Sequence, residues 1–232
     1  MRDKLSTMKS PIPPLNTAEL LHRAWAVAGL NLQELALRAN WTLPPGSLVH
    51  HKGWVGKLIE WHLGATGESK AQADFPKLGI ELKTIPVDQQ GRPLESTYVC
   101  TAPALASLHE LYWEDSWLKR KLSHVLWLPL EGMRDKPIAE RRLGAPLLWR
   151  PSLDIEQVLR QDWEELLSLL FLGEPAKIRA HYGRYLQLRP KAAHSRIVNT
   201  HYDSEGNLQV STPKGFYLRT SFTSEILQHH YG

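Results

Sequence analysis

The sequence predicts an α/β protein of the α+β type, in which a mixed β-sheet is flanked by helices. Helix-like and strand-like stretches both occur, but they do not alternate as regular strand–helix–strand units. This order favours a mixed sheet over a doubly wound parallel sheet. The 232 residues, of which 42% are hydrophobic, are enough to bury a core as one large domain or as two smaller lobes.

Helix-start patterns and apolar periodicity define the predicted helices. Asn16 with Glu19, and Asn31 with Glu34, fit the capping-box pattern at the starts of two helices. Apolar residues recur every three or four positions in one long stretch that ends at Gly173. The predicted helices cover about residues 17–29, 32–39, 53–63, 154–172 and 175–181, with a last helix from about residue 221.

Short apolar runs bounded by turn-forming residues predict the strands. They cover about residues 79–85, 97–102, 124–130, 146–149, 184–188, 207–211 and 216–219. We expect most of the nine tryptophans, including Trp25, Trp127 and Trp163, to lie in hydrophobic cores.

The composition argues against several protein classes. The opening MRDKLSTMKSPIPP contains charges and prolines but no apolar run, so we expect no signal peptide. No apolar stretch is long enough to span a bilayer. A single cysteine, Cys100, excludes an internal disulfide and a Cys-rich zinc site. We therefore expect a soluble, cytoplasmic protein that does not associate with a membrane.

Basic residues are concentrated near the C-terminus. Residues 174–232 contain eight Lys and Arg against four Asp and Glu, an excess of four that equals the net charge of +4 for the whole chain. The rest of the chain is therefore neutral. A basic segment beside a neutral one suggests a polyanionic partner, although a solvated basic face explains the charge equally well.

The stretch GIELKTIPVD, residues 79–88, places a carboxylate and an ammonium two positions apart in a predicted strand. Residues i and i+2 of a strand point to the same face, so Glu81 and Lys83 share one face. Ile80 and Leu82 then enter the core. The pair is either a solvated ion pair or half of an active site.

Two further carboxylates can reach this strand. Asp74 precedes Glu81 by seven positions across FPKLG, whose proline and glycine turn the chain back. Glu60 lies on the preceding helix, on a side formed mainly by glycines, where another backbone can approach closely. The alternative for Glu60 is a solvent-facing residue near the end of an amphipathic helix.

Three carboxylates and one lysine suit metal-dependent hydrolysis of a phosphodiester. Mg²⁺ prefers hard oxygen ligands, keeps several of its waters and binds phosphate oxygens. We expect Asp74, Glu81 and the backbone carbonyl of Leu82 to hold Mg²⁺, with Mn²⁺ as a substitute. Lys83 would orient or help to deprotonate the attacking water. Glu60 would bind a second ion or hold the water network.

The order Asp74, then Glu81-x-Lys83, resembles the motif of the PD-(D/E)xK nuclease superfamily. Eight longer stretches resemble one family within it, MutH, the strand-nicking endonucleases of methyl-directed DNA mismatch repair. The eight follow the family's order over about residues 16–230 and read KGWVGKLIEWHLGA, DFPKLGIELKTIPVD, GRPLESTYVC, KRKLSHVLWLPLEG, GAPLLWRP, QDWEELLSLLFLG, YLQLRPKAA and PKGFYLR. The superfamily motif alone is unspecific, whereas the series of eight is highly specific.

The resemblance implies a restriction-endonuclease-like core whose two lobes form a clamp around duplex DNA. A catalytic lobe would cover about residues 1–120, and a DNA-reading lobe would cover about residues 121–232. The implied activity is Mg²⁺-dependent nicking of the unmethylated strand at hemimethylated GATC sites. The implied partners are MutL, as activator, and MutS, which recognises the mismatch and acts indirectly.

The resemblance also implies roles for individual residues. The matches to catalytic positions are Glu60, Asp74, Glu81, Lys83 and a further active-site lysine, Lys121. The matches to DNA-contacting positions are Lys52, Arg189, Pro190, Lys191 and Tyr217, and Tyr217 is the implied reader of adenine methylation. Glu95 and Tyr98 match positions where the chain approaches the bases, and Tyr98 adds a hydroxyl where the family usually has Phe.

One departure from the family's pattern affects a predicted DNA-contacting loop. His50-His51 stands where the family usually has an Arg-Asp pair, directly before Lys52. A second segment, residues 197–212, looks shorter than its counterpart and different from it. The detailed DNA contacts of both segments are therefore expected to differ from those of the family.

Two alternatives to a mismatch-repair nickase remain. A type II restriction endonuclease with the same core would cut both strands at GATC and would act without MutL. A DNA-binding module that has lost catalysis belongs to another class of protein. The presence of all four polar catalytic positions speaks against it.

Overall fold

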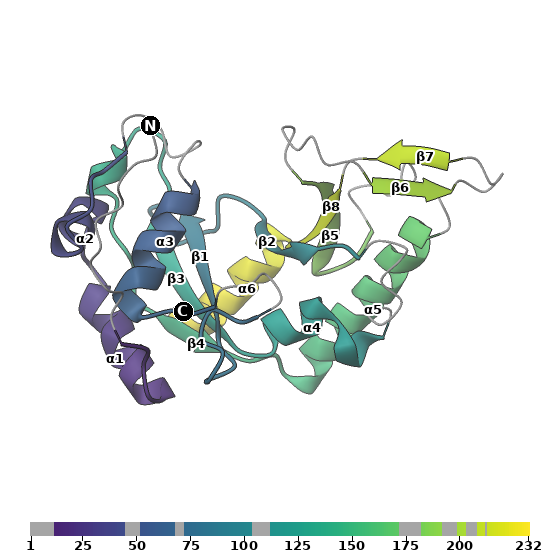
Figure 1. The fold of residues 1–232 in the computed structure, drawn as a ribbon, viewed down its shortest axis with the longest axis horizontal. Helices are drawn as coiled ribbons and strands as arrows, with labels where there is room; N and C mark the ends of the chain where they lie inside the picture. The colour runs from purple at the N-terminus through teal and green to yellow at the C-terminus, as the bar shows by residue number, and fades with distance from the viewer. Residues whose placement is uncertain are drawn as a thin grey trace. The chain divides into compact units, whose positions relative to one another are not determined.

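The computed structural model describes residues 12–44, 52–67, 72–103, 112–171, 182–191, 199–202, 208–211 and 213–232. Its helices and strands belong to two compact units, and Figure 1 labels them along the chain. The first unit comprises Met1–Leu94 and Val125–Trp149, and the second comprises Glu95–His124 and Arg150–Gly232. These units differ from the expected division at about residue 120. Residues 125–131 form a strand that pairs with residues 81–87, so they belong to the first unit.

A three-stranded mixed sheet forms the centre of the first unit, in the order β1-β3-β4. Strand β1 (Glu81–Val87) runs parallel to β3 (Val125–Glu131), and β3 runs antiparallel to β4 (Leu147–Trp149). A parallel pair requires a long crossover connection, which here is supplied by residues of the second unit. The prediction of a mixed sheet with flanking helices is confirmed.

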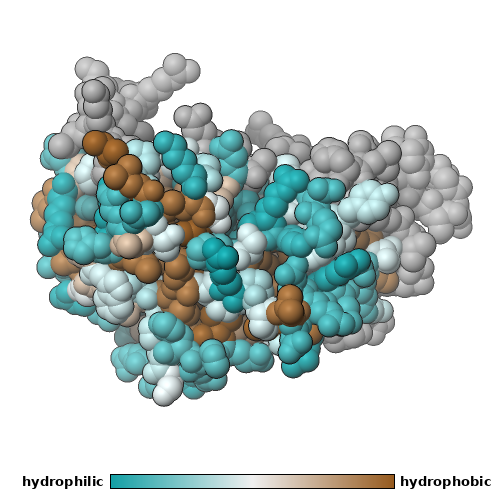
Figure 2. All heavy atoms as spheres, turned by 90° about the horizontal axis from the view of Figure 1, so that it is seen from below, coloured by the Kyte–Doolittle hydropathy of each residue, from teal (hydrophilic) through white to brown (hydrophobic). Residues whose placement is uncertain are grey.

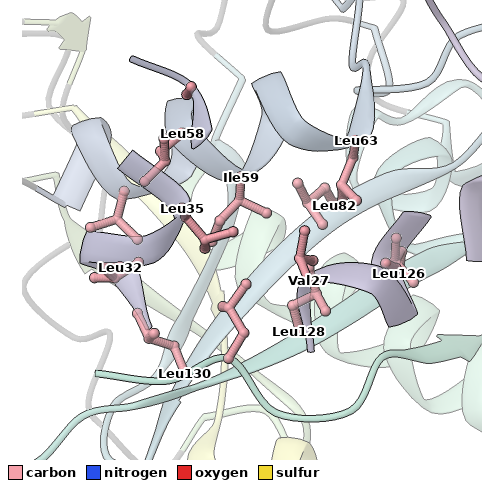
Figure 3. Packing of buried hydrophobic residues seen from close by; sticks show 14 of the residues in the cluster. Val27, Leu32, Leu35, Leu58, Ile59, Leu63, Leu82, Leu126, Leu128 and Leu130 are labelled. Carbon is pink, nitrogen blue, oxygen red and sulfur yellow. The ribbon is translucent and has the colours of Figure 1, made fainter. Parts of the chain in front are cut away.

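Three helices pack on this sheet to form the hydrophobic core of the first unit. They are α1 (Thr17–Val27), α2 (Leu32–Arg38) and α3 (Lys52–Leu63), as Figure 1 shows. Figure 3 shows Leu58, Ile59 and Leu63 of α3 beside Leu82 of β1. Residues on β3 complete the same core with alternate side chains, Leu126, Leu128 and Leu130. One face of β1 and β3 is therefore committed to packing.

The helix starts of the first unit follow the predicted capping chemistry with one difference. Asn31 and Glu34 form a reciprocal capping box at the start of α2. At α1 the Asn16 side chain accepts a hydrogen bond from the Glu19 N–H, but the Glu19 carboxylate accepts from Leu15 instead. The expectation of a core position for Trp25 on α1 is wrong, because the side chain is 57% exposed.

The second unit contains an antiparallel sheet in the order β2-β8-β5. Its strands are β2 (Thr97–Thr101), β8 (Lys214–Leu218) and β5 (Leu186–Pro190). A separate antiparallel pair consists of β6 (Asn199–Tyr202) and β7 (Leu208–Ser211). The helices of this unit are α4 (Trp117–Leu122), α5 (Leu153–Phe171) and α6 (Thr220–Tyr231). Two short 3₁₀ helices, η3 (Trp113–Asp115) and η4 (Ile138–Glu140), lie in the second and first units respectively.

A buried carboxylate fixes the start of β5 against α5. The Asp162 side chain accepts hydrogen bonds from the backbone N–H groups of Arg184, Tyr185 and Leu186 at 2.7, 2.6 and 2.8 Å. A carboxylate that accepts several backbone N–H groups is a strong anchor. The Tyr185 ring also stacks on Phe222 of α6, with the ring centroids 3.9 Å apart. The strand that leads to Arg189 therefore starts from a rigid point.

Several element boundaries differ from those predicted. Strand β1 begins at Glu81 instead of residue 79, because Gly79 adopts a φ of +63° in the turn before the strand. Strands β5 and β8 lie two residues away from their predicted starts, and neither α4 nor β6 was predicted. The helix predicted over 175–181 falls outside the described residues.

A membrane span requires a helix that is both long and strongly apolar. No helix in the ranges that the structure describes meets both requirements. On the face shown in Figure 2, hydrophilic residues surround smaller hydrophobic areas.

Candidate functional site

The first cluster of polar side chains lies at the start of β1. Lys83 Nζ donates to Glu81 Oε1 at 2.6 Å, and the two side chains are only 12% and 4% exposed. The alternative of a solvated ion pair is therefore wrong. A buried ion pair contributes little net stability, because the desolvation of both charges offsets their attraction. Its position consequently points to chemistry more than to folding.

Asp74 is brought to the same place by the turn that precedes β1. Phe75 and Ile80 exchange backbone hydrogen bonds across the turn, as the FPKLG pattern predicted. Asp74 Oδ2 then accepts a hydrogen bond from the Leu82 N–H at 2.8 Å. Leu82 itself enters the core, so the strand presents its backbone to Asp74 between the side chains of Glu81 and Lys83.

The electrostatics show that Glu60 also faces this cluster. Burial, followed by the charge of Glu81, raises the pKa of Asp74 to about 6. Burial likewise raises the pKa of Glu60, which Glu81 raises further and Lys57 and Lys83 lower. The structure therefore brings Glu60, Asp74, Glu81 and Lys83 together, with three carboxylates repelling one another in a partly desolvated site.

Glu60 has the glycine neighbour that the sequence indicated. A Cβ placed on Gly56 would lie 3.8 Å from Glu60 Oε1, which is ordinary contact. The carboxylate therefore rests directly over Gly56 on α3. The half-buried side chain is not the solvent-facing residue of the alternative interpretation.

The fit of a divalent cation can be judged from the donor atoms. Across the described ranges, no three His, Cys, Asp or Glu side chains form a group that could hold a metal ion alone. Mg²⁺ does not require such a group, since it keeps several waters and is held by one or two carboxylates. Asp74 and Glu81 supply two carboxylates, the Leu82 carbonyl is a further oxygen, and a cation would relieve their repulsion. These residues therefore fit Mg²⁺.

A hydrophobic layer lies on the Lys83 side of β1. Trp127 on β3 is directly opposite Lys83 in the parallel register and is fully buried. Its ring packs against Trp149 of β4, with centroids 6.2 Å apart. Opposite residues of paired strands point to the same face, so apolar rings exclude water beside the ion pair. A low local dielectric strengthens the interactions of the remaining charges.

The second cluster covers one face of the β2-β8-β5 sheet. Phe216 and Leu218 of β8 are buried, together with Leu186 of β5, and form the packed face. The opposite face, called the polar face below, consists of Tyr98, Thr101, Gln187, Arg189, Lys191 and Tyr217. The alternation of β8 places Tyr217 on this face, as predicted from the burial of Phe216.

Aromatic rings and cations alternate on the polar face. The Tyr98 and Tyr217 rings face each other across the strand register, with centroids 5.3 Å apart. The Arg189 guanidinium lies 5.7 Å from the Tyr217 ring centroid, and the Lys191 ammonium lies 5.3 Å from that of Tyr98. Cations at these distances are attracted to the ring faces. Positive charge interleaved with aromatic rings is typical of a nucleic-acid contact surface.

Hydroxyl groups hold the two cations of the polar face. Arg189 donates to Ser96 Oγ at 2.7 Å, and Lys191 Nζ donates to Thr101 Oγ1 at 3.0 Å. No pattern in the sequence indicated Ser96 or Thr101 as functional residues. Both lie in strand β2 or directly before it, and only their pairing with β8 and β5 brings them to these cations.

Tyr217 is protonated over the whole physiological pH range. Burial raises the pKa of its phenol, and the nearby Tyr98 and Glu95 raise it further, whereas Arg189 lowers it. A neutral phenol both donates and accepts hydrogen bonds. Tyr217 therefore offers both functions on the polar face, and the exposed Glu95 is close enough to influence it.

The remaining predicted site residues lie in several elements. Lys121 is buried in the last turn of α4, and Pro190 is exposed at the end of β5. Lys52 is the first residue of α3. His50 and His51 lie outside the described residues, as does half of the divergent segment 197–212.

Comparison with known proteins gives one consistent family. Residues 63–162 match the family model described as the DNA mismatch repair enzyme MutH. The DNA mismatch repair protein MutH of Vibrio parahaemolyticus is 52% identical over 218 residues, covering 94% of this chain and 96% of its own length. The protein of the same name from Vibrio cholerae (strain O395) is 53% identical, with coverages of 94% and 98%. The one from Shewanella sp. (strain MR-4) is 48% identical, with coverages of 97% and 100%.

Proposed function

Because this chain belongs to the MutH family of DNA mismatch repair enzymes, we propose that it nicks the unmethylated strand of duplex DNA at hemimethylated GATC sites. The observation that carries the chemistry is the junction of Asp74, Glu81 and Lys83 at the start of β1, where Glu60 adds a third carboxylate. An endonuclease of mismatch repair needs such a site to hydrolyse a phosphodiester.

In the proposed reaction, Asp74, Glu81 and the Leu82 carbonyl hold Mg²⁺, or Mn²⁺ as a substitute. The bound ion supplies Lewis-acid activation of the phosphate and of water. The ion pair with Glu81 holds the Lys83 ammonium. Its other N–H groups would donate to the attacking water and to the developing negative charge. Glu60 holds the water network or a second ion. Lys121 is proposed as a further active-site lysine on the basis of the resemblance alone.

The polar face is proposed to read the DNA. Arg189 and Lys191 can donate to base edges or phosphates, and the neighbouring Pro190 is exposed. Tyr217 is proposed to contact the adenine edge, since N6 methylation replaces an amino hydrogen with an apolar group in the major groove. Lys52, Glu95 and Tyr98 complete the proposed contact set. The two-lobed clamp stays a prediction from the resemblance.

The proposed partners follow from the family's place in repair. MutL would activate the enzyme, and MutS would act indirectly by recognising the mismatch. We propose that this chain acts in the cytoplasm, where a DNA repair enzyme of a bacterium meets its DNA. A type II restriction endonuclease at GATC is the second candidate, because the same core and metal chemistry serve double-strand cleavage.

A plasmid-nicking assay tests the proposed function. The substrate is a supercoiled plasmid with one GATC site in the unmethylated, hemimethylated or fully methylated state, with and without MutL and Mg²⁺. We expect open-circle product from the first two states, nicking of only the unmethylated strand of the second, and strong stimulation by MutL. A matched plasmid without GATC is the control.

Three outcomes would contradict the proposal in different ways. Linear product without MutL would support the restriction endonuclease instead. Specific binding without any cleavage in Mg²⁺ or Mn²⁺ would support a catalytically inactive DNA-binding module. Equal nicking of all three methylation states would refute methyl-directed strand choice.

A substitution at Tyr217 tests the proposed reader of methylation. We expect Tyr217→Ser to change the ratio of single-turnover nicking rates on the three methylation states, because a phenol contact to adenine is lost. A change of about 1–3 kcal/mol is the usual range for one base contact. An equal fall on all three substrates would show that Tyr217 supports the fold or the backbone grip instead.

A further inference from the structure

Thr101, the last residue of β2, joins two other side chains of the polar face. Its Oγ1 accepts a hydrogen bond from Lys191 Nζ at 3.0 Å and lies 2.9 Å from the Tyr98 hydroxyl. The Lys191 ammonium also lies 5.3 Å from the centroid of the Tyr98 ring. One hydroxyl therefore holds a lysine and a tyrosine that already contact each other.

We propose that Thr101 is a positioning residue, which fixes the Lys191 ammonium to read the edge of a base, and that the Tyr98 hydroxyl completes this arrangement. The inference rests on the proposed function, since it assumes that the polar face meets DNA. It adds a determinant of specificity, Thr101, which does not contact the DNA itself but positions the side chain of Lys191 that does.

A β-bulge is what allows Thr101 and Tyr98 to meet. Residues three positions apart in a regular strand point to opposite faces. The register of β2 against β8 shifts between Tyr98 and Cys100, so Tyr98 lies opposite Tyr217 while Thr101 lies opposite Gly215. Bulges often redirect a side chain at a functional site. Here the bulge places both hydroxyl groups on the polar face.

Gly215 supports the arrangement from β8. A Cβ at Gly215 would lie 2.8 Å from Cε2 of Tyr98, closer than real Cβ contacts, and 3.3 Å from the Cys100 carbonyl oxygen, which is a tight contact. The Tyr98 ring therefore packs directly on the glycine backbone. The Tyr98 ring packs on Gly215, and its hydroxyl forms a hydrogen bond with Thr101. Lys191 contacts both the ring and the Thr101 hydroxyl.

The hydrogen bonds among Lys191, Thr101 and Tyr98 leave several donor groups available to a ligand. A lysine ammonium has three donors and no acceptor, and Thr101 uses one of the three. Thr101 and Tyr98 share one hydrogen bond, which leaves one hydroxyl proton of the pair free to donate. The arrangement is thus rich in donors and matches the adjacent acceptors N7 and O6 of guanine in the major groove. Each strand of GATC contains one guanine.

Preorganisation is the physical benefit of this arrangement. A free lysine side chain loses much rotamer entropy when it is fixed on a ligand. Thr101 and the Tyr98 ring restrict Lys191 before DNA binds, so less freedom is lost on binding. The smaller entropy loss strengthens binding to the specific sequence, because there the Lys191 ammonium must contact one base edge. In non-specific complexes the lysine serves as a charge alone.

The test compares Thr101→Val with Thr101→Ser in the full-length protein, using binding to a GATC duplex and to a scrambled duplex. Valine keeps the shape but removes the hydroxyl, whereas serine keeps it. We expect T101V to weaken GATC binding by about 5- to 20-fold, at the lower end of the range for the loss of one base contact. Binding to the scrambled duplex should change by less than about 2-fold, and the salt dependence should stay the same, because Lys191 keeps its charge.

Matched variants separate positioning from folding. Thr97→Val makes the same change on the same strand, but Thr97 is buried opposite Leu218 on the packed face, so specificity should not change. Lys191→Ala should remove the effect of T101V, so that the double variant is no weaker than K191A alone. Tyr98→Phe should give a smaller loss than T101V, because Thr101 still accepts from Lys191.

The outcomes distinguish the inference from the function on which it rests. Equal GATC affinity of T101V and T101S, in a protein that prefers GATC, would overturn the inference and leave the proposed function intact. Additive losses for T101V and K191A would overturn it as well. A wild-type protein without preference for GATC would refute the proposed function and the base-reading role together.

Discussion

The Asp74 carboxylate occupies a position that destabilises the folded protein whenever it is ionised. Burial and the charge of Glu81 raise its pKa to about 6, from an ordinary value of 3.8. The folded state therefore binds the proton more tightly than the unfolded state does. Below the unfolded pKa both states are protonated and there is no penalty. As the pH rises through 3.8 towards 6, the penalty grows, and above that window it is complete.

The first prediction concerns Asp74→Asn, which removes this charge and keeps an acceptor for the Leu82 N–H. In a chelator at pH 7.5 we expect the variant to be more stable than wild type by about 1–2 kcal/mol, less than the full shift implies because the group is partly solvated. The difference should shrink to a small fraction of this near pH 4, which lies just above the ordinary pKa of 3.8, and should vanish at lower pH. Urea unfolding at both pH values measures it, and a difference that does not change with pH would contradict the assignment.

Single residues also show what the sequence could predict about the site. The shared face of Glu81 and Lys83 followed from the two-residue period of a strand, and the approach of Asp74 followed from the FPKLG turn. The roles of Ser96 and Thr101 could not be predicted, because pairing between distant strands and a bulge decide their neighbours. Trp25 was misplaced because an apolar face of a helix does not reveal how far the core extends.

At the scale of elements, the predictable features were those with a long repeating pattern or a local start signal. The long helix α5 and the capped helix α2 were predicted close to their observed bounds. Helix α4 was not, because its six residues are too short for periodicity and its Ser116 cap lacks the glutamate of a capping box. The shifted starts of β5 and β8 depend on their mutual pairing, which no local pattern specifies.

The second prediction concerns the packing between β2 and β8. Gly215→Ala should displace the Tyr98 ring, since the added Cβ would overlap Cε2, and overpacking of this kind costs about 1–3 kcal/mol of stability. We also expect a loss of GATC affinity of about 10-fold, the size of a lost base contact. Thermal unfolding and binding measurements test both effects.

Gly53→Ala is the matched control for this substitution. Nothing lies within 4 Å of a Cβ at Gly53, which is on the exposed side of α3. Alanine is the better helix former, so the control should stabilise the protein by about 0.5–1 kcal/mol. A Gly215→Ala protein as stable and as specific as wild type would show that the Tyr98 ring adjusts freely.

At the scale of the whole molecule, the two clusters of candidate site residues are divided between the two units. The carboxylate cluster with Lys83 lies in the first unit, and the polar face with Arg189 and Lys191 lies in the second. The sequence predicted a basic segment at residues 174–232 and a neutral remainder. It did not predict that each unit would be assembled from two segments, because the pairing of β3 with β1 is a tertiary feature.

The third prediction concerns the basic segment at residues 174–232. If this segment neutralises phosphates, the logarithm of the DNA-binding constant should fall linearly with the logarithm of salt concentration. The slope should be about −0.9 per phosphate contacted. Fluorescence anisotropy over a range of NaCl concentrations measures the slope. Affinity that hardly changes with salt would contradict a basic DNA-binding surface, and Arg189→Ala should reduce the slope by about one unit if it contacts a phosphate.

The most direct test of the central claim is single-turnover nicking of a hemimethylated GATC duplex by Glu81→Gln in Mg²⁺, with DNA binding measured in parallel. Asp74→Asn serves as a second variant, and Glu140→Gln, the same change at an exposed position of the first unit, serves as the control. We predict that both site variants lose nicking by at least about 100-fold while they keep DNA affinity within about 3-fold, because the lost oxygen ligands act mainly in the transition state. Glu140→Gln should behave as wild type. Near-wild-type nicking by a folded Glu81→Gln protein would contradict the claim that this carboxylate cluster is the active site.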